Sequence, residues 1–124
     1  MHFVHLGIHT EFSITESIVR IPDLIKAAVN DEMPALALTD LSNLHAAVKF
    51  YGSCQSKGIK PILGSVIRLN DAEHRVTLLA MTNQGWRGLT EIVSRGFIEG
   101  QQLDIPCVQK DWVLEQHDDI IALL

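Results

Sequence analysis

The sequence predicts an α/β fold in which parallel strands alternate with helices. Strand-like and helix-like stretches follow one another along the chain, and Pro34 and Gly58 end two of the helical stretches. The run 35–39 is apolar up to Thr39, as is typical of a strand buried on both faces of a parallel sheet. Right-handed crossovers would join such strands, which could close into a barrel or remain an open sheet.

Composition and charge limit the classes of protein to which the chain could belong. The 124 residues, 47% hydrophobic and 20% charged, suit one globular domain or part of one. A net charge of -5 without clustered Lys or Arg argues against a nucleic-acid clamp. Neither a leader peptide nor an apolar run of membrane-spanning length occurs, so we expect a cytoplasmic protein without membrane contact. Cys54 and Cys107 are expected to be free, buried thiols.

The first half of the chain predicts two strands and two helices. Alternating apolar residues predict a strand at 2–9, and a helix follows at 22–32, with Pro22 in its first turn. After the buried strand 35–39, Ser42 or Asn43 could cap a second helix. The apolar stripes of these helices are predicted at Leu24, Ile25, Ala28 and Val29, and at Leu44, Ala47, Val48 and Tyr51.

The second half continues the alternation. It predicts strands at 60–69, 75–81 and 119–124, helices at about 84–98 and 110–117, and a loop at 100–106. Asn70 and Asp71 are expected to turn the chain between the first two of these strands. Helix 84–98 has a predicted stripe of Leu89, Ile92, Val93 and Phe97, and Gly85, Gly88 and Gly96 are expected to weaken it.

Four phrases carry a family resemblance. They are FVHLGIHTEFS at 3–13, MPALALTDLSNLHAAVKFY at 33–51, GIKPILGSVI at 58–67 and LLAMTNQGWRGLTEIVSRGF at 78–97. Together they resemble the PHP domain of the bacterial DNA polymerase III alpha subunit. The resemblance implies a distorted (β/α)7 barrel, of which residues 1–124 would be the N-terminal portion of a single domain, without the polymerase domains.

The same resemblance maps metal-ligand positions onto the chain. The H-x-H motif reads Gly7-Ile8-His9, T-D-H reads Thr39-Asp40-Leu41, the glutamate position falls on Val66, and an aspartate position falls on Glu16. Gly7, Leu41 and Val66 have no donor atoms in their side chains, and the metal ions of a phosphoesterase need several N and O ligands. We therefore expect these to be vestigial positions, with no bound metal and no catalytic residue.

The mapped polar residues also have structural interpretations. His9 is either a packing histidine or a surviving ligand, Asp40 either caps the following helix or acts as a base, and Glu16 is either solvated or a ligand. His45, His74 and His117 are expected at the surface or in packing contacts. Trp86 and Trp112 are expected to be packing anchors, with a partner surface as the alternative.

Two functions follow from the resemblance. In the first, the segment is non-catalytic, uses no cofactor of its own, stabilises the polymerase subunit and docks the proofreading exonuclease subunit. In the second, it is a residual metal-dependent phosphoesterase or 3′–5′ exonuclease. The parent protein would be a DNA-directed DNA polymerase, a nucleotidyltransferase that uses Mg²⁺ and contacts DNA through its other domains, and the fragment alone is predicted not to be an enzyme.

Overall fold

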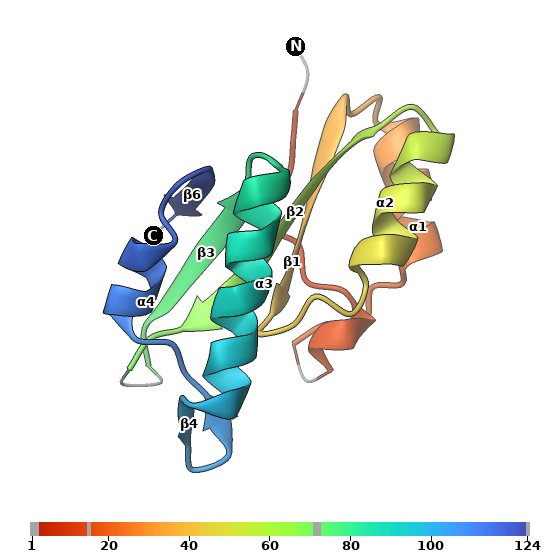
Figure 1. Ribbon diagram of the computed structural model, residues 1–124. Coiled ribbons are helices and arrows are strands. Elements are labelled where there is room, and N and C mark those ends of the chain that lie inside the picture. The colour runs from red at the N-terminus through yellow and green to blue at the C-terminus, as the bar shows by residue number, and fades with distance from the viewer. Residues whose placement is uncertain (1–2, 15, 71–72, 124) are drawn as a thin grey trace.

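The computed structural model describes residues 3–14, 16–70 and 73–123. It has an α/β architecture in which helices cover one face of a four-stranded sheet (Figure 1). The elements of the first half are η1 (Glu11–Ser13), α1 (Ile21–Asn30), β1 (Ala35–Leu41), α2 (Ala47–Ser56) and β2 (Lys60–Arg68). Those of the second half are β3 (Arg75–Ala80), α3 (Asn83–Ile98), β4 (Gln101–Gln102), β5 (Ile105–Pro106), α4 (Lys110–Glu115) and β6 (Ile120–Leu123).

The sheet is mixed, which corrects the prediction of an all-parallel one. Its order is β1-β2-β3-β6, with β1 and β2 parallel and the other two pairs antiparallel. The short connection between β2 and β3 has no room for a crossover helix, so β3 runs back beside β2. The predicted turn includes Asp71, which lies outside the described residues.

The N-terminal segment is extended but forms no regular strand, so the prediction of a strand at 2–9 was wrong for the described residues. Ala37 N donates to His5 O at 3.0 Å, and Thr39 N donates to Ile8 O at 2.9 Å. The two acceptor carbonyls are three residues apart along the N-terminal segment, whereas the two donor amides are two residues apart along β1. The segment therefore cannot keep a regular strand register with β1. In addition, Ile8 N donates to the Thr39 hydroxyl, at 2.9 Å, instead of to a strand carbonyl.

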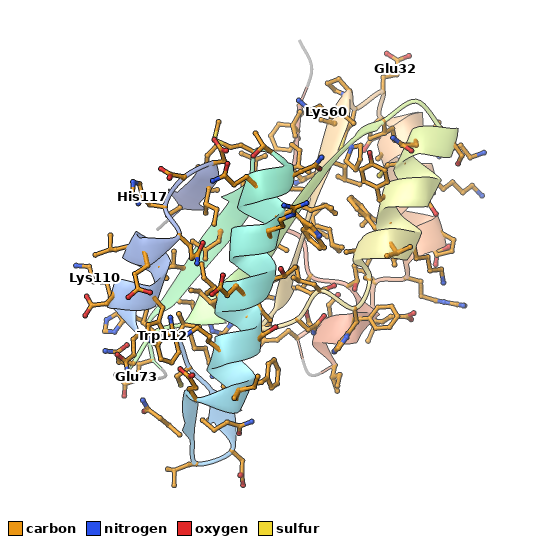
Figure 2. All side chains as sticks on the ribbon, viewed as in Figure 1. Glu32, Lys60, Glu73, Lys110, Trp112 and His117 are labelled. Carbon is orange, nitrogen blue, oxygen red and sulfur yellow. The ribbon has the colours of Figure 1, made fainter. Side chains whose placement is uncertain are left out.

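Two apolar clusters hold the helices on the sheet. One joins α1 and α2 to β1 and includes Ile25, Leu36 and Phe50; the other joins α3 and α4 to β2 and β3. In the second cluster, Trp112 is buried and the Arg95 guanidinium lies 4.1 Å from its ring centroid, which confirms Trp112 as a packing anchor (Figure 2).

Several local predictions for the helices needed correction. The inward face of α2 consists of Ala47, Phe50 and Cys54, whereas Val48 and Tyr51 of the predicted stripe are exposed. Neither Ser42 nor Asn43 caps α2, whose N-cap is Ala46 without a side-chain bond. The glycines of α3 serve close packing, because a Cβ at Gly85 would lie 2.1 Å from the Asp119 carbonyl oxygen.

Candidate functional site

Asp40 is at the centre of a buried hydrogen-bond network near the end of β1. The residue is 1% exposed. Oδ1 accepts from Thr10 N at 2.5 Å and from Ser13 Oγ at 2.7 Å, and Oδ2 accepts from Thr10 Oγ1 at 2.8 Å. Ser13 Oγ also accepts from Leu41 N at 3.0 Å. Asp40 therefore ties the segment that begins η1 to β1, and does not cap the helix that follows it.

The H-x-H positions lie on the extended segment that enters this network. His9 is half-buried and directly precedes Thr10. Gly7 is exposed, and a Cβ built on it would meet no atom within 4 Å. Packing therefore leaves space for a larger side chain at position 7, and the missing imidazole is not the result of crowding.

Leu41 and Val66 are neighbours at the ends of the two parallel strands. They are paired in the β1–β2 register, and Ser42 N donates to Val66 O at 2.7 Å. Val66 is 7% exposed and Leu41 is half-buried. Two mapped ligand positions thus lie side by side, and both present hydrocarbon.

Glu16 neutralises a pair of arginines at the same end of the sheet. Arg68 and Arg75 face each other across the β2–β3 pair, where like charges repel. Arg75 Nη2 donates to Glu16 Oε1 at 3.1 Å. This hydrogen bond and the charge of Arg75 lower the pKa of Glu16, and the charges of His9 and Arg68 add to the effect.

We expect Arg75→Gln to raise the pKa of the Glu16 carboxyl toward its ordinary value, because the variant removes the cation that lowers it. An NMR titration of the Glu16 carboxyl carbon measures the change. The lowered pKa favours the folded state above the ordinary value, and this contribution is lost as the pH falls through the folded-state value. Arg95→Gln, which breaks exposed pairs with Glu99 and Glu115, is the control. A Glu16 pKa unchanged by Arg75→Gln would contradict the assignment.

The structure brings the mapped positions to one end of the strands, yet their side chains do not form a ligand set. Within residues 3–14, 16–70 and 73–123, no group of three or more His, Cys, Asp or Glu side chains could hold a metal ion. The carboxylate oxygens of Asp40 and Glu16, which are the atoms that could bind a metal, already accept hydrogen bonds from protein groups. Of the mapped positions, His9, Glu16 and Asp40 carry side-chain N or O atoms, and Gly7, Leu41 and Val66 carry none.

Three residues that shape this site were given no role from the sequence: Ser13, Arg75, and Thr10, which follows the H-x-H positions. Thr10 and Ser13 are hydroxyl residues close after His9, which is the only local signal of their role. Arg75 is 59 positions from Glu16, so nothing in the local pattern could pair them.

The other histidines and the two cysteines that the sequence analysis considered lie outside this network. His45, His74 and His117 are exposed, as expected. Cys54 and Cys107 are buried free thiols, also as expected, and burial raises the pKa of Cys54 to about 11. In the part of the chain that the structure describes, every helix is too short or too polar to cross a membrane.

Comparison with known proteins finds relatives that are the same polymerase subunit in different bacteria. The chain is 46% identical to the DNA polymerase III subunit alpha of Pseudomonas aeruginosa over 98% of its residues and 11% of that protein. The same subunit of Escherichia coli K12 is 36% identical, with the same coverage of both chains. The chain is thus homologous to the N-terminal part of these subunits and spans 11% of their length.

A solved structure shows the same fold. It is a protein from Bifidobacterium adolescentis assigned as a metal-dependent phosphoesterase, with a TM-score of 0.55 at 16% identity. The match covers 77% of this chain and 32% of that one. The model of the PHP domain family matches residues 5–124. Because that match includes nearly every residue, the chain belongs to the PHP domain family.

Proposed function

We propose that residues 1–124 are the N-terminal portion of a single PHP domain in a replicative DNA polymerase III alpha subunit, and that this portion is non-catalytic. Identities of 36–46% to such subunits over nearly the whole chain support the first part. The parent protein would be a cytoplasmic DNA-directed DNA polymerase, with its Mg²⁺ and its DNA contacts in other domains. The segment would need no cofactor of its own.

One observation carries the non-catalytic part of the proposal. Where ligands are expected, Leu41 and Val66 pack side by side with no donor atom between them. Metal-assisted phosphoester hydrolysis needs ions that stabilise developing charge and supply hydroxide. An apolar pair at two ligand positions removes the coordination on which that chemistry depends.

The polar residues that persist near these positions have other partners. Thr10 and Ser13 donate to Asp40, and Arg75 donates to Glu16. Such bonds fasten the segment around η1 to the sheet, which suits a structural role in the subunit. We infer that the domain stabilises the polymerase chain and offers the proofreading exonuclease subunit a docking surface.

Calorimetric titration with Mn²⁺ and Zn²⁺ tests the proposal. We expect no stoichiometric binding, because too few ligands converge on any ion. His9→Ala is the diagnostic variant, and His117→Ala is its control, since His117 is an exposed histidine outside the mapped positions.

The competing function is a residual phosphoesterase, and the N and O side chains that persist at three mapped positions, His9, Glu16 and Asp40, favour it. A stoichiometric isotherm that is lost in His9→Ala and kept in His117→Ala would replace the proposal with that function. Weak heat removed equally by both variants would be non-specific binding to surface imidazoles, and the non-catalytic proposal would stand.

A further inference from the structure

A groove lies between α1 and α2, which pack side by side against β1 (Figure 1). Its volume is about 440 Å³, within the range of ligand sites. The apolar part of its lining comes from α1 and consists of Pro22, Ile25 and Val29. None of the mapped metal positions lines this groove, so it is separate from the site around Asp40.

Basic side chains flank the apolar lining on both sides. Lys26 belongs to α1, and Lys57 caps the C-terminal end of α2. Both are exposed, and within the described part of the chain neither makes an ion pair. The described residues that line the groove include no Asp or Glu. Two cations beside an apolar strip favour an occupant that carries carboxylates on both flanks of an apolar stripe.

The positive charge is local to this part of the surface. The segment 41–70, which includes α2 and β2, has basic residues but no Asp or Glu: Lys49, Lys57, Lys60 and Arg68. Asp23 of α1, and Asp31 and Glu32 beyond its end, lie outside the lining. The whole chain nevertheless has a net charge of -5. An acidic partner would thus be attracted to α2 and repelled by the acidic remainder of the chain.

The surroundings of the groove favour a helix as its occupant. An extended segment needs a sheet edge to pair its backbone groups, but here both walls are helices whose backbone groups bond internally. A proline-rich segment needs aromatic rings, and none of the described lining residues is aromatic. A helix pairs its own backbone groups and can pack between two others. The α1 wall, from Pro22 to Asn30, is about 12 Å long, which matches two helical turns.

We propose that the α1–α2 groove binds an acidic amphipathic helix of another protein. Two turns of its apolar stripe pack on Ile25 and Val29, and carboxylates on either side of that stripe pair with Lys26 and Lys57. This inference concerns the outer surface of the helices and does not depend on whether the segment is catalytic.

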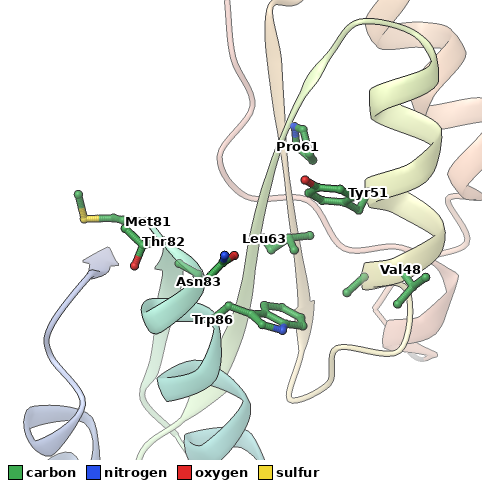
Figure 3. A pocket seen from close by; sticks show the side chains of 10 residues that line it. Val48, Tyr51, Pro61, Leu63, Met81, Thr82, Asn83 and Trp86 are labelled. Carbon is green, nitrogen blue, oxygen red and sulfur yellow. The ribbon is translucent and has the colours of Figure 1, made fainter.

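The other side of α2 offers an internal comparison. There α2 and α3 form a second groove, lined by Val48, Tyr51 and Trp86 among others (Figure 3). The described residues that line it include no charged side chain. A probe that binds through paired charges should therefore choose the α1–α2 groove, and the Trp86 indole signal reports binding at the wrong one.

The test is an NMR titration of the ¹⁵N-labelled full chain with a synthetic helix. The probe is a capped peptide of about sixteen residues, built from Leu, Ala and Glu, with Glu on both sides of a Leu stripe. We expect saturable shifts of the Lys26, Val29 and Ser56 amides and an unchanged Trp86 indole signal. The double variant Lys26→Glu with Lys57→Glu should weaken binding by about tenfold, because two attractions become repulsions.

Lys49→Glu is the matched control, since it makes the same exchange at an exposed residue of α2 outside the lining. It should change the affinity by less than about twofold. A probe with Lys in place of Glu should bind the double variant and not the native chain, which also shows that the variant is folded. The proposal would be overturned by any of four results: no saturable binding, an equal loss in Lys49→Glu, no binding of the lysine probe to the double variant, or tighter binding of a single-stranded oligonucleotide at the same amides.

Discussion

Asp40→Ala is expected to destabilise the folded chain by about 3 kcal/mol or more, because it leaves three buried or partly buried donors without their acceptor. These are the Thr10 amide, the Thr10 hydroxyl and the Ser13 hydroxyl, and both residues are themselves buried. Each unsatisfied donor costs about 1–3 kcal/mol, which is large against the total stability of a small domain. Urea unfolding followed by circular dichroism measures the loss.

Asp40→Asn is the matched control. The amide oxygen can still accept from Thr10 N and Ser13 Oγ, and the Thr10 hydroxyl can turn to accept from the new NH₂ group. We therefore expect a smaller loss, about 1 kcal/mol. A carboxylate held free for catalysis or metal binding behaves differently, because removal of an unpaired buried charge stabilises the fold. A gain in stability for Asp40→Ala would thus refute the structural role assigned to this residue.

Much of the fold could be predicted because it depends on local patterns. The buried strand 35–39 corresponds to β1, the helix 22–32 to α1, and the helix 84–98 to α3. The direction of β3 was missed, since strand periodicity is the same in either orientation. The inward face of α2 was predicted only at Ala47: Phe50 and Cys54 follow helical spacing from Ala47 as well as Val48 and Tyr51 do, and only the packed position of the helix decides between them.

The site was predictable to a lesser degree. The absence of donors at Gly7, Leu41 and Val66 can be read from their chemistry alone. That Leu41 and Val66 touch follows from a β1–β2 register that the sequence did not specify. The partners of Asp40 and Glu16 depend on contacts between residues 27–59 positions apart, which local pattern cannot encode.

The second large effect is expected for Val66→Glu, which restores a carboxylate at a mapped ligand position. In the β1–β2–β3 register the introduced side chain would lie between Leu41 and Thr77, and neither residue can neutralise it. Arg68 shares that face two positions along the strand, at a backbone distance of about 6.6 Å, and would offset only part of the cost. We expect a loss of about 3 kcal/mol in urea unfolding at neutral pH.

Three comparisons test whether the loss of stability in Val66→Glu comes from the apolar packing around position 66. Val48→Glu is the same exchange at a residue 85% exposed, and it should change stability by no more than about 0.5 kcal/mol. Gly7→His should also be mild, because space around Gly7 is open. Added Mn²⁺ or Zn²⁺ should not rescue Val66→Glu, since Leu41 and Gly7 still supply no donors. If Val66→Glu were as mild as Val48→Glu, or if metal restored its stability, position 66 would be part of a site still able to bind ions.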